Sequence, residues 1–433
     1  MKWTLIATVV LILCGCSKGV APAPEAAKAE PLKNGLEVVL RPIEGAKSVA
    51  LVVQYSIGDR NDPEGASGMA HLIEHLLATC ATPGHPARDV DTLVDTYPDG
   101  FNAQTGDDYT LVSTVFPKER LEAELADAAA RMTDLRIEPE DVQRELGRLE
   151  VELANMYKSV PSLASQNYAA QAVAPPLVGA RRGGVLEQMR AIPLDTLRAR
   201  VAAYYQPRNA MLVLAGDLAP AQAQAMVEKA FGKISGGEAL PEVALARAPV
   251  TTGTTELPAS GLLGGGYAAV AYPAPSPKDP EYAGFLMLAS ILQTRAIDFG
   301  APKGVAPVQF APLDRPEVLI VSAPPLAGED AAKAATRIEA IVRRELEAAH
   351  VDTRLLTRTF GFLLGLEGTP ETEMALNPYG VAFGIARRRQ LGIDPAALAS
   401  RINTLSDAEL ARARTVMLEH VGKAVVRSSA ANR

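Results

Sequence analysis

The residues best suited to chemistry lie in one short stretch, residues 68–77, which contains the pattern His-x-x-Glu-His. Helix-forming and apolar residues fill the other positions, so the stretch predicts a helix that begins near Gly68. On a helix His71 and His75 share one face, with Cβ atoms roughly 5–6 Å apart, and their imidazoles can bind one tetrahedral zinc ion. Glu74 can point toward the same ion without binding it, where a general base for a water molecule is needed. His-x-x-Glu-His is one of two related zinc-hydrolase signatures; the alternative is a surface helix with two unrelated histidines.

A zinc site of this kind needs a third protein ligand and one open position. The candidates are three acids of a second predicted helix, residues 140–157: Glu145, Glu150 and Glu152. Glu145 and Glu152 lie on one side of that helix but about 10 Å apart along its axis, so they cannot both bind one ion. Glu150 is rotated away from that side, and His85, in a Pro-Gly-His-Pro turn, is interpreted as an exposed loop residue. Geometry leaves Glu145 and Glu152 as open alternatives.

Length and composition indicate an ordinary globular protein. The 433 residues are enough for two or three domains with well-filled cores. Hydrophobic residues make up 48% and charged residues 21%, which are typical values. A net charge of −7 without a long basic run argues against nucleic-acid binding.

The amino terminus predicts a signal peptide, because residues 4–13 form an apolar run too short to span a bilayer. The sequence LCGC at residues 13–16 resembles a bacterial lipobox, which implies a lipoprotein anchored through Cys16. Ser17 is similar to a signal for sorting to the outer membrane, so we expect the protein to face the periplasm. Ordinary secretion is the alternative. Cys80 would then be the remaining thiol, and no intrachain disulfide is expected.

The order of predicted elements indicates two similar α/β units. A strand at 267–272 followed by an apolar helix repeats the pattern of residues 49–77, but this helix has no histidine, so only the first unit can hold metal. The predicted organisation comprises a signal peptide (1–16), a flexible tether (17–31), a first domain (32–236), a Gly- and Pro-rich linker (237–249) and a second domain (250–430).

Several stretches of the first half resemble the pitrilysin/insulinase metallopeptidases, the M16 family, in its short two-domain bacterial form. They are LKNGLEV at 32–38, GASGMAHLIEH at 65–75, NAQT at 102–105, the acidic helix at 145–152, IPL at 192–194, YYQPRN at 204–209, GD at 216–217 and FG at 231–232. The resemblance implies an α+β fold of two similar units, each a mostly antiparallel sheet with helices on one face.

The resemblance also implies site residues and an activity. In that family the third ligand is the glutamate that ends a Glu-x6-Glu pair, which corresponds to Glu152. Glu145 would be a helper carboxylate that holds a histidine or the water in place. Asn102 and Ala103 would lie on an edge strand to which an extended peptide adds by backbone pairing. The implied protein is a zinc endopeptidase that cleaves peptides or unfolded segments in an enclosed chamber, with Glu74 passing a proton from water to the leaving amine.

The second half departs from the family pattern. Relatives carry an Arg and a Tyr in a run like R-E-x-x-G-L-x-Y, whereas residues 292–312 retain Arg295 without the tyrosine, and Tyr379 is interpreted as a turn or packing residue. We therefore expect a homo- or heterodimer in which a second M16-like subunit supplies the Arg/Tyr pair. One alternative function is a non-catalytic scaffold or assembly subunit of a periplasmic complex. Another is a binding lipoprotein with an accidental histidine pair.

Overall fold

The computed structural model describes residues 27–28, 31–175, 181–241, 250, 253–257, 266–295, 298–300, 306–366 and 377–427. The predicted signal peptide with Cys16, most of the tether and most of the linker lie outside these residues. Among the helices described, none is both long enough and apolar enough to cross a membrane.

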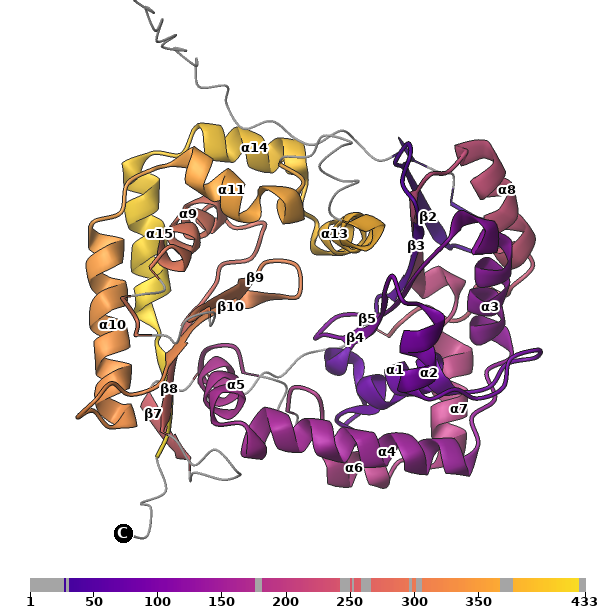
Figure 1. Cartoon of the computed structure of the whole chain (residues 1–433), viewed down its shortest axis with the longest axis horizontal. Coiled ribbons are helices and arrows are strands. Elements are labelled where there is room, and N and C mark those ends of the chain that lie inside the picture. Colours follow the sequence, from indigo (N-terminus) through magenta and orange to yellow (C-terminus); the bar gives the residue numbers. More distant parts are fainter. Residues whose placement is uncertain are drawn as a thin grey trace, which may run out of the picture.

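The first half of the chain forms one sheet with its helices (Figure 1). Its strands are β1 (Ala27–Lys28), β2 (Glu37–Pro42), β3 (Val49–Tyr55), β4 (Phe101–Thr105), β5 (Thr110–Phe116) and β6 (Ala210–Gly216). Its helices are α1 (Met69–Thr79), α2 (Val90–Thr96), α3 (Leu121–Thr133), α4 (Pro139–Ala154), α5 (Pro161–Val173), α6 (Leu186–Arg190), α7 (Leu194–Tyr204) and α8 (Pro220–Phe231).

The second half forms another sheet with its own helices. Its strands are β7 (Gly253–Leu257), β8 (Tyr267–Pro273), β9 (Val308–Ala311), β10 (Arg315–Ala323) and β11 (Gly422–Val426). Its helices are α9 (Tyr282–Gln293), α10 (Ala331–Glu347), α11 (Thr353–Leu364), α13 (Asn377–Leu391), α14 (Pro395–Asn403) and α15 (Asp407–Glu419).

The two sheets have the same topology, which confirms the predicted repeat. The first has the order β1-β2-β6-β3-β5-β4 and the second β7-β11-β8-β10-β9, so β2 corresponds to β7, β6 to β11 and β4 to β9. In each sheet the pair β2–β6 or β7–β11 is parallel and the pairs that follow it are antiparallel. The fold is therefore the predicted α+β arrangement of two similar units, and β4 and β9 are the corresponding edge strands.

The central strands of each sheet are buried on both faces, which explains why they are largely apolar runs. Every residue of β3 is buried. One face of the first sheet packs against helices of its own unit, and the other packs against α13 of the second unit through Val381, Ala382, Ile385 and Ala386. The second sheet is covered in the same way by α5 of the first unit.

The two units thus exchange one helix each across the molecule (Figure 1). Helix α5 approaches its sheet closely because its contacting residues are small, and Gly422 of β11 leaves room for its backbone. A Cβ on Gly422 would lie 2.6 Å from the Ala169 carbonyl oxygen. The predictions included no helix at residues 161–173, so they did not anticipate this exchange. Since each sheet depends on a helix of the other unit, the walls of any cleft between the units are held in place.

Candidate metal centre

Helix α1 is held at its amino end by a carboxylate from the preceding loop. Asp62 accepts the backbone N–H groups of Gly68 at 2.7 Å and Ala70 at 2.9 Å, which would otherwise lack partners at the helix start. Burial, reinforced by the charge of Asp59, raises the pKa of Asp62 well above its ordinary value. Gly68 itself has φ +98°, a left-handed conformation that favours glycine.

The carboxyl end of α1 is held by a buried arginine from α3. Arg131 Nη1 donates to the carbonyl oxygens of Leu77 at 2.7 Å and Cys80 at 3.3 Å. A cation at this position also complements the helix dipole. Cys80 is fully buried and packs as a small core residue. Both ends of the helix that carries the histidines are therefore fixed by buried polar side chains that bond its terminal backbone groups.

A double-glycine turn orients His71. The Gly183 carbonyl accepts a hydrogen bond from His71 Nδ1 at 2.9 Å, and the Gly183 N–H donates to Asp59 at 3.2 Å. The next residue, Gly184 (φ +99°), packs directly on Gly68, since a Cβ on Gly184 would lie 2.4 Å from the Gly68 Cα. Because a carbonyl can only accept, His71 carries its proton on Nδ1 and presents Nε2 as a lone-pair donor.

His75 is oriented by Glu145. Its Nδ1 lies 3.2 Å from Glu145 Oε2, and this fully buried carboxylate also accepts bonds from Thr79 Oγ1 and Arg144 Nε, each at 3.0 Å, and from Arg148. Although burial raises the pKa of Glu145, the hydrogen bond with His75 and the charge of Arg148 outweigh it, and the net shift is downward. An ionised Glu145 keeps the proton of His75 on Nδ1, so Nε2 again faces the cleft.

Glu152 lies where the two Nε2 atoms converge. Its Oε1 is 3.5 Å from His71 Nε2 and its Oε2 is 3.7 Å from His75 Nε2. Two ligands of one tetrahedral zinc ion, each about 2.0–2.1 Å from the metal, are separated by about 3.3 Å. The three groups therefore have the chemistry and the spacing of a zinc ligand set.

Glu74 occupies the remaining side of the same space. One polar atom from each of His71, Glu74 and His75 lies within 4.8 Å of the others. Glu74 is 6% exposed, and its Oε2 accepts a hydrogen bond from Thr105 Oγ1 of β4 at 2.7 Å. Thr105 thus holds the carboxylate beside the histidines and links it to the edge strand.

A cleft of about 460 Å³ opens in front of these residues. Asn102 and Ala103 of β4 line it, and among the strands that the structure describes β4 pairs with β5 alone. The second unit contributes Asp314, in the turn between β9 and β10. Asp314 Oδ1 accepts hydrogen bonds from Tyr109 Oη at 2.6 Å and Gln104 Nε2 at 3.1 Å, so this turn is attached to the strands beside the cleft.

Of the two residues of the second unit considered from sequence, Arg295 lies away from the cleft and Tyr379 lies beside β4. Arg295 forms an ion pair with Glu345 of α10 at 2.9 Å and does not line the cleft. Tyr379 is more than a turn or packing residue, because its hydroxyl accepts a hydrogen bond from Asn102 Nδ2 at 3.1 Å. Tyr379 also packs against the first sheet and Phe383, in agreement with the packing interpretation, because α13 crosses to that sheet.

Sequence reasoning missed the loop at residues 181–184 and its neighbours. Arg182 lines the cleft, and its guanidinium pairs with the Glu317 carboxylate at 3.5 Å. The backbone carbonyl of Arg182 accepts a hydrogen bond from Tyr157 Oη at 2.9 Å. Tyr157 belongs to a π-helical turn, Asn155–Ser159, that directly follows α4 and ends the predicted helix early. The adjacent glycines 183 and 184 were the available signal, since paired glycines often mark close backbone contacts.

The fold and the site together define a class: a repeated α+β protein that carries the inverted zinc-hydrolase motif on its first unit. The family models agree. Residues 37–181 match the model described as insulinase (peptidase family M16), and residues 191–299 match the peptidase M16 inactive domain. The chain belongs to the M16 family.

Known relatives support this assignment. The zinc protease PqqE of Helicobacter pylori is 26% identical over 216 residues, 49% of this chain and 48% of that protein. A crystal structure of a protease from Helicobacter pylori has the same fold, with a TM-score of 0.76 and 19% identity over 94% of this chain and all of that one. The periplasmic protease PqqL of Escherichia coli aligns with a TM-score of 0.69 and 16% identity over 95% of this chain but 48% of its own. The chain spans about half the length of the curated relatives it matches.

Proposed function

We propose that this protein is a zinc-dependent endopeptidase in which His71, His75 and Glu152 bind the metal. The observation that carries the proposal is the position of Glu152, with its two oxygens 3.5 and 3.7 Å from the two Nε2 atoms. Curated relatives named zinc proteases support it.

The protein side chains around the metal position have distinct roles. A bound zinc ion would supply Lewis acidity toward the scissile carbonyl and toward water. Glu74, which Thr105 holds through Oε2, takes a proton at Oε1 and delivers it to the leaving amine. Glu145 acts as a positioning residue, because it contacts His75 on the side away from the cleft.

The substrate we propose is a peptide or an unfolded segment. Strand β4 offers a free edge beside Glu74, and an extended chain can pair with its backbone at Asn102 and Ala103. Val90 and Val94 of α2, 41% and 55% exposed, form an apolar wall of the same cleft and suit an apolar side chain of the substrate.

We propose further that activity requires a second M16-like subunit, which encloses the chamber and supplies an Arg/Tyr pair. The PqqL chain, of which this chain covers 48%, provides the precedent for a protein of twice this size. Within the described residues Arg182 is a cation at the cleft, but Asp314 and Glu317 already contact it. The lipid anchor at Cys16 in the outer membrane remains a proposal from the leader sequence.

The test compares wild type with Glu74→Gln for zinc content and for cleavage of a mixture of quenched peptides. Glu74→Gln should retain zinc and lose about 10²- to 10⁴-fold in turnover. Glu150→Gln, a surface change on α4, is the matched control and should cleave normally. Turnover by Glu74→Gln at the wild-type rate would refute the base role. Zinc binding without turnover, alone or with any homologous subunit, would favour the non-catalytic scaffold.

A further inference from the structure

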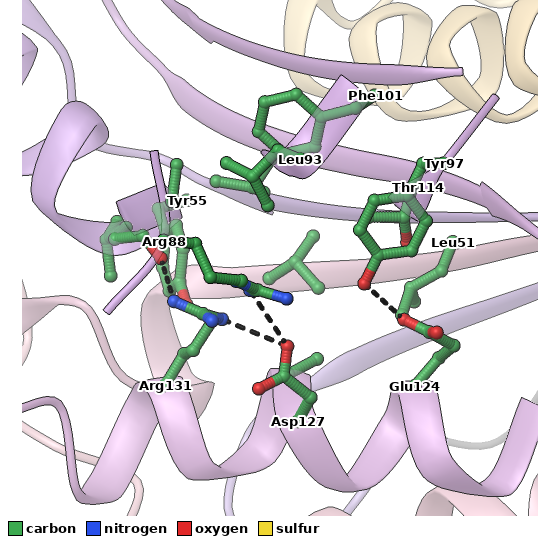
Figure 2. Close-up of a pocket in the computed structure, with 15 residues that line it drawn as sticks. Leu51, Tyr55, Arg88, Leu93, Tyr97, Phe101, Thr114, Glu124, Asp127 and Arg131 are labelled. Atoms are coloured by element: carbon green, nitrogen blue, oxygen red, sulfur yellow. Dashed lines mark hydrogen bonds and ion pairs between the residues drawn. The ribbon is translucent and has the colours of Figure 1, made fainter. Parts of the chain in front are cut away.

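Two hollows adjoin the metal cleft and share wall residues with it. The first lies between the first sheet and helices α1, α2 and α3 and has a volume of about 50 Å³ (Figure 2). Its charged groups bond partners in its own wall, since Arg88 and Arg131 donate to Asp127 and Glu124 accepts from Tyr97 (Figure 2). This small hollow is therefore part of the packing that supports α1.

The second hollow is larger and lies between the two units. It has a volume of about 660 Å³ and is bounded by α5 of the first unit and by strands β9 and β10 of the second (Figure 1). We name it the β9 pocket. Met156, Arg182 and Asp314 line both the β9 pocket and the metal cleft, so the two spaces are adjacent. A peptide bound in the metal cleft can therefore extend into the β9 pocket.

Arg315 is a cation in the wall of the β9 pocket, and a neutral amide holds it in place. It is the first residue of β10, beside a shift in register between β9 and β10 of the kind that redirects side chains. Its Nη1 donates to Asn167 Oδ1 at 3.3 Å. Asn167 is 7% exposed, and its own Nδ2 donates to the Met156 carbonyl at 3.1 Å. The guanidinium is therefore fixed without the help of a close acid.

The carboxylate of Glu317 is shared between two arginines. Its Oε1 accepts a hydrogen bond from Arg182 Nη1 at 3.5 Å and lies 3.7 Å from Arg315 Nε, beyond hydrogen-bond distance. Among the residues that the structure describes, none bonds Arg315 Nη2, the nitrogen left to face the pocket, since Nε is enclosed by protein atoms. Burial lowers the pKa of Arg315 to about 10, and the charge of Arg182 adds to this effect against the charge of Glu317. The guanidinium is thus short of negative charge on the pocket side.

We propose, on the basis of the proposed peptidase function, that the β9 pocket binds a carboxylate of the substrate peptide on Arg315 Nη2. A carboxylate forms charge-assisted hydrogen bonds with a guanidinium, whereas a phosphate dianion would be repelled more strongly by Asp314 and Glu317 nearby. Gln309 of β9 and Leu163 of α5, both exposed, add amide and apolar surface that suits the stem of an acidic residue. The carboxylate belongs either to an acidic side chain or to a free carboxyl terminus, which share this chemistry.

The experiment measures the fluorescence anisotropy of labelled decapeptides with the zinc-loaded full chain that carries Glu74→Gln, so that binding is measured without cleavage. One series contains Ala, Leu and Gln with an amidated carboxyl terminus, and one Glu replaces a Gln at successive positions. A second series has no Glu and compares the free terminus with the amide. Glu at one position, or the free terminus, should lower the Kd about tenfold or more. The first result assigns the site to a side chain and the second to the terminus.

Three variants in the same background test the location. Arg315→Gln should abolish the preference and keep the Kd of the neutral peptide, which also separates this site from carboxylate binding to zinc. Gln309→Glu changes an exposed residue of the same wall and should weaken the acidic peptide about threefold by repulsion. Arg354→Gln, an exposed arginine of α11 outside the pocket lining, is the matched control and should bind as the parent does. Thermal scans establish that each variant is folded.

The outcomes separate the carboxylate site from the proposed peptidase. The carboxylate site is overturned if acidic and neutral peptides bind equally in both series, if the preference persists in folded Arg315→Gln, or if Gln309→Glu leaves it unchanged. Each of these results leaves the peptide substrate standing. Absence of binding by every peptide overturns the carboxylate site together with the proposed peptide substrate.

Discussion

Replacing Glu145 by glutamine should weaken zinc binding although Glu145 does not contact the metal position. The carboxylate is fully buried and lies 3.2 Å from His75 Nδ1, so it fixes both the ring orientation and the tautomer. Glutamine keeps the shape and one acceptor oxygen but removes the charge. Loss of a charge-assisted hydrogen bond of this kind costs about 1.5–3 kcal/mol, which corresponds to about 10- to 100-fold in zinc affinity.

The measurement is zinc affinity by competition with a chromophoric chelator, together with thermal unfolding of the chelated protein. Glu150→Gln is the matched control, because Glu150 lies on the same helix and forms an exposed ion pair with Arg190 at 2.7 Å. Exposed pairs of this kind contribute little, so the control should keep wild-type zinc affinity. Glu152→Gln should lose more zinc affinity than Glu145→Gln, since Glu152 is a proposed zinc ligand.

If folded Glu145→Gln binds zinc as tightly as wild type, Glu145 does not position His75 for the metal. If Glu150→Gln loses as much zinc affinity as Glu145→Gln, the loss reflects the total charge of the helix and not the contact with His75. A loss explained only by unfolding would appear as a lowered melting temperature in the chelated protein.

Three further outcomes are expected. Gly184→Ala should lower the free energy of unfolding by about 2–5 kcal/mol in urea titrations, because the new Cβ would meet Gly68 and the backbone φ is positive. Gly65→Ala is the control: its φ is also positive but the space around it is open, so the free energy of unfolding should fall by about 1–2 kcal/mol. Burial raises the pKa of Asp59 from 3.8 to about 6, so the folded chain holds more protons than the unfolded one between these values and its stability should fall as pH rises through this window. Asp59→Asn should flatten that dependence in chelated protein, and an unchanged slope would contradict the assignment. Zinc at about 1,000 times its Kd should stabilise the chain by about 4 kcal/mol in calorimetric scans, and Glu152→Gln should lose most of this gain.

The local elements could be predicted well because their patterns are local. The helix that carries His71 and His75 and the strand β4, which holds Asn102 and Ala103, are confirmed, since helical and strand periodicities arise from neighbouring residues. Helix α5 was missed because its apolar residues are mostly alanines, which give a weak periodic signal. The predicted helix at 140–157 changes to a π-helical turn at Asn155, and nothing in the local sequence indicates that change.

The candidate metal site likewise has one part that the local sequence predicts and another part that depends on packing between elements. The spacing of His71, Glu74 and His75 alone determined which chemistry the protein could perform, because one helical turn places them on one face. The sequence also determined the repeat, in which the second unit has no histidine pair.

The periodicity of the helix left Glu145 and Glu152 as alternatives and the family resemblance implied Glu152; the tertiary structure brings Glu152 close to both Nε2 atoms and places Glu145 against His75 Nδ1. The turn at Gly183, the exchanged helices α5 and α13, and the Asp314 contact are likewise tertiary results. They join residues more than 65 positions apart, and such contacts depend on packing between elements, which the periodicity of any single element does not encode.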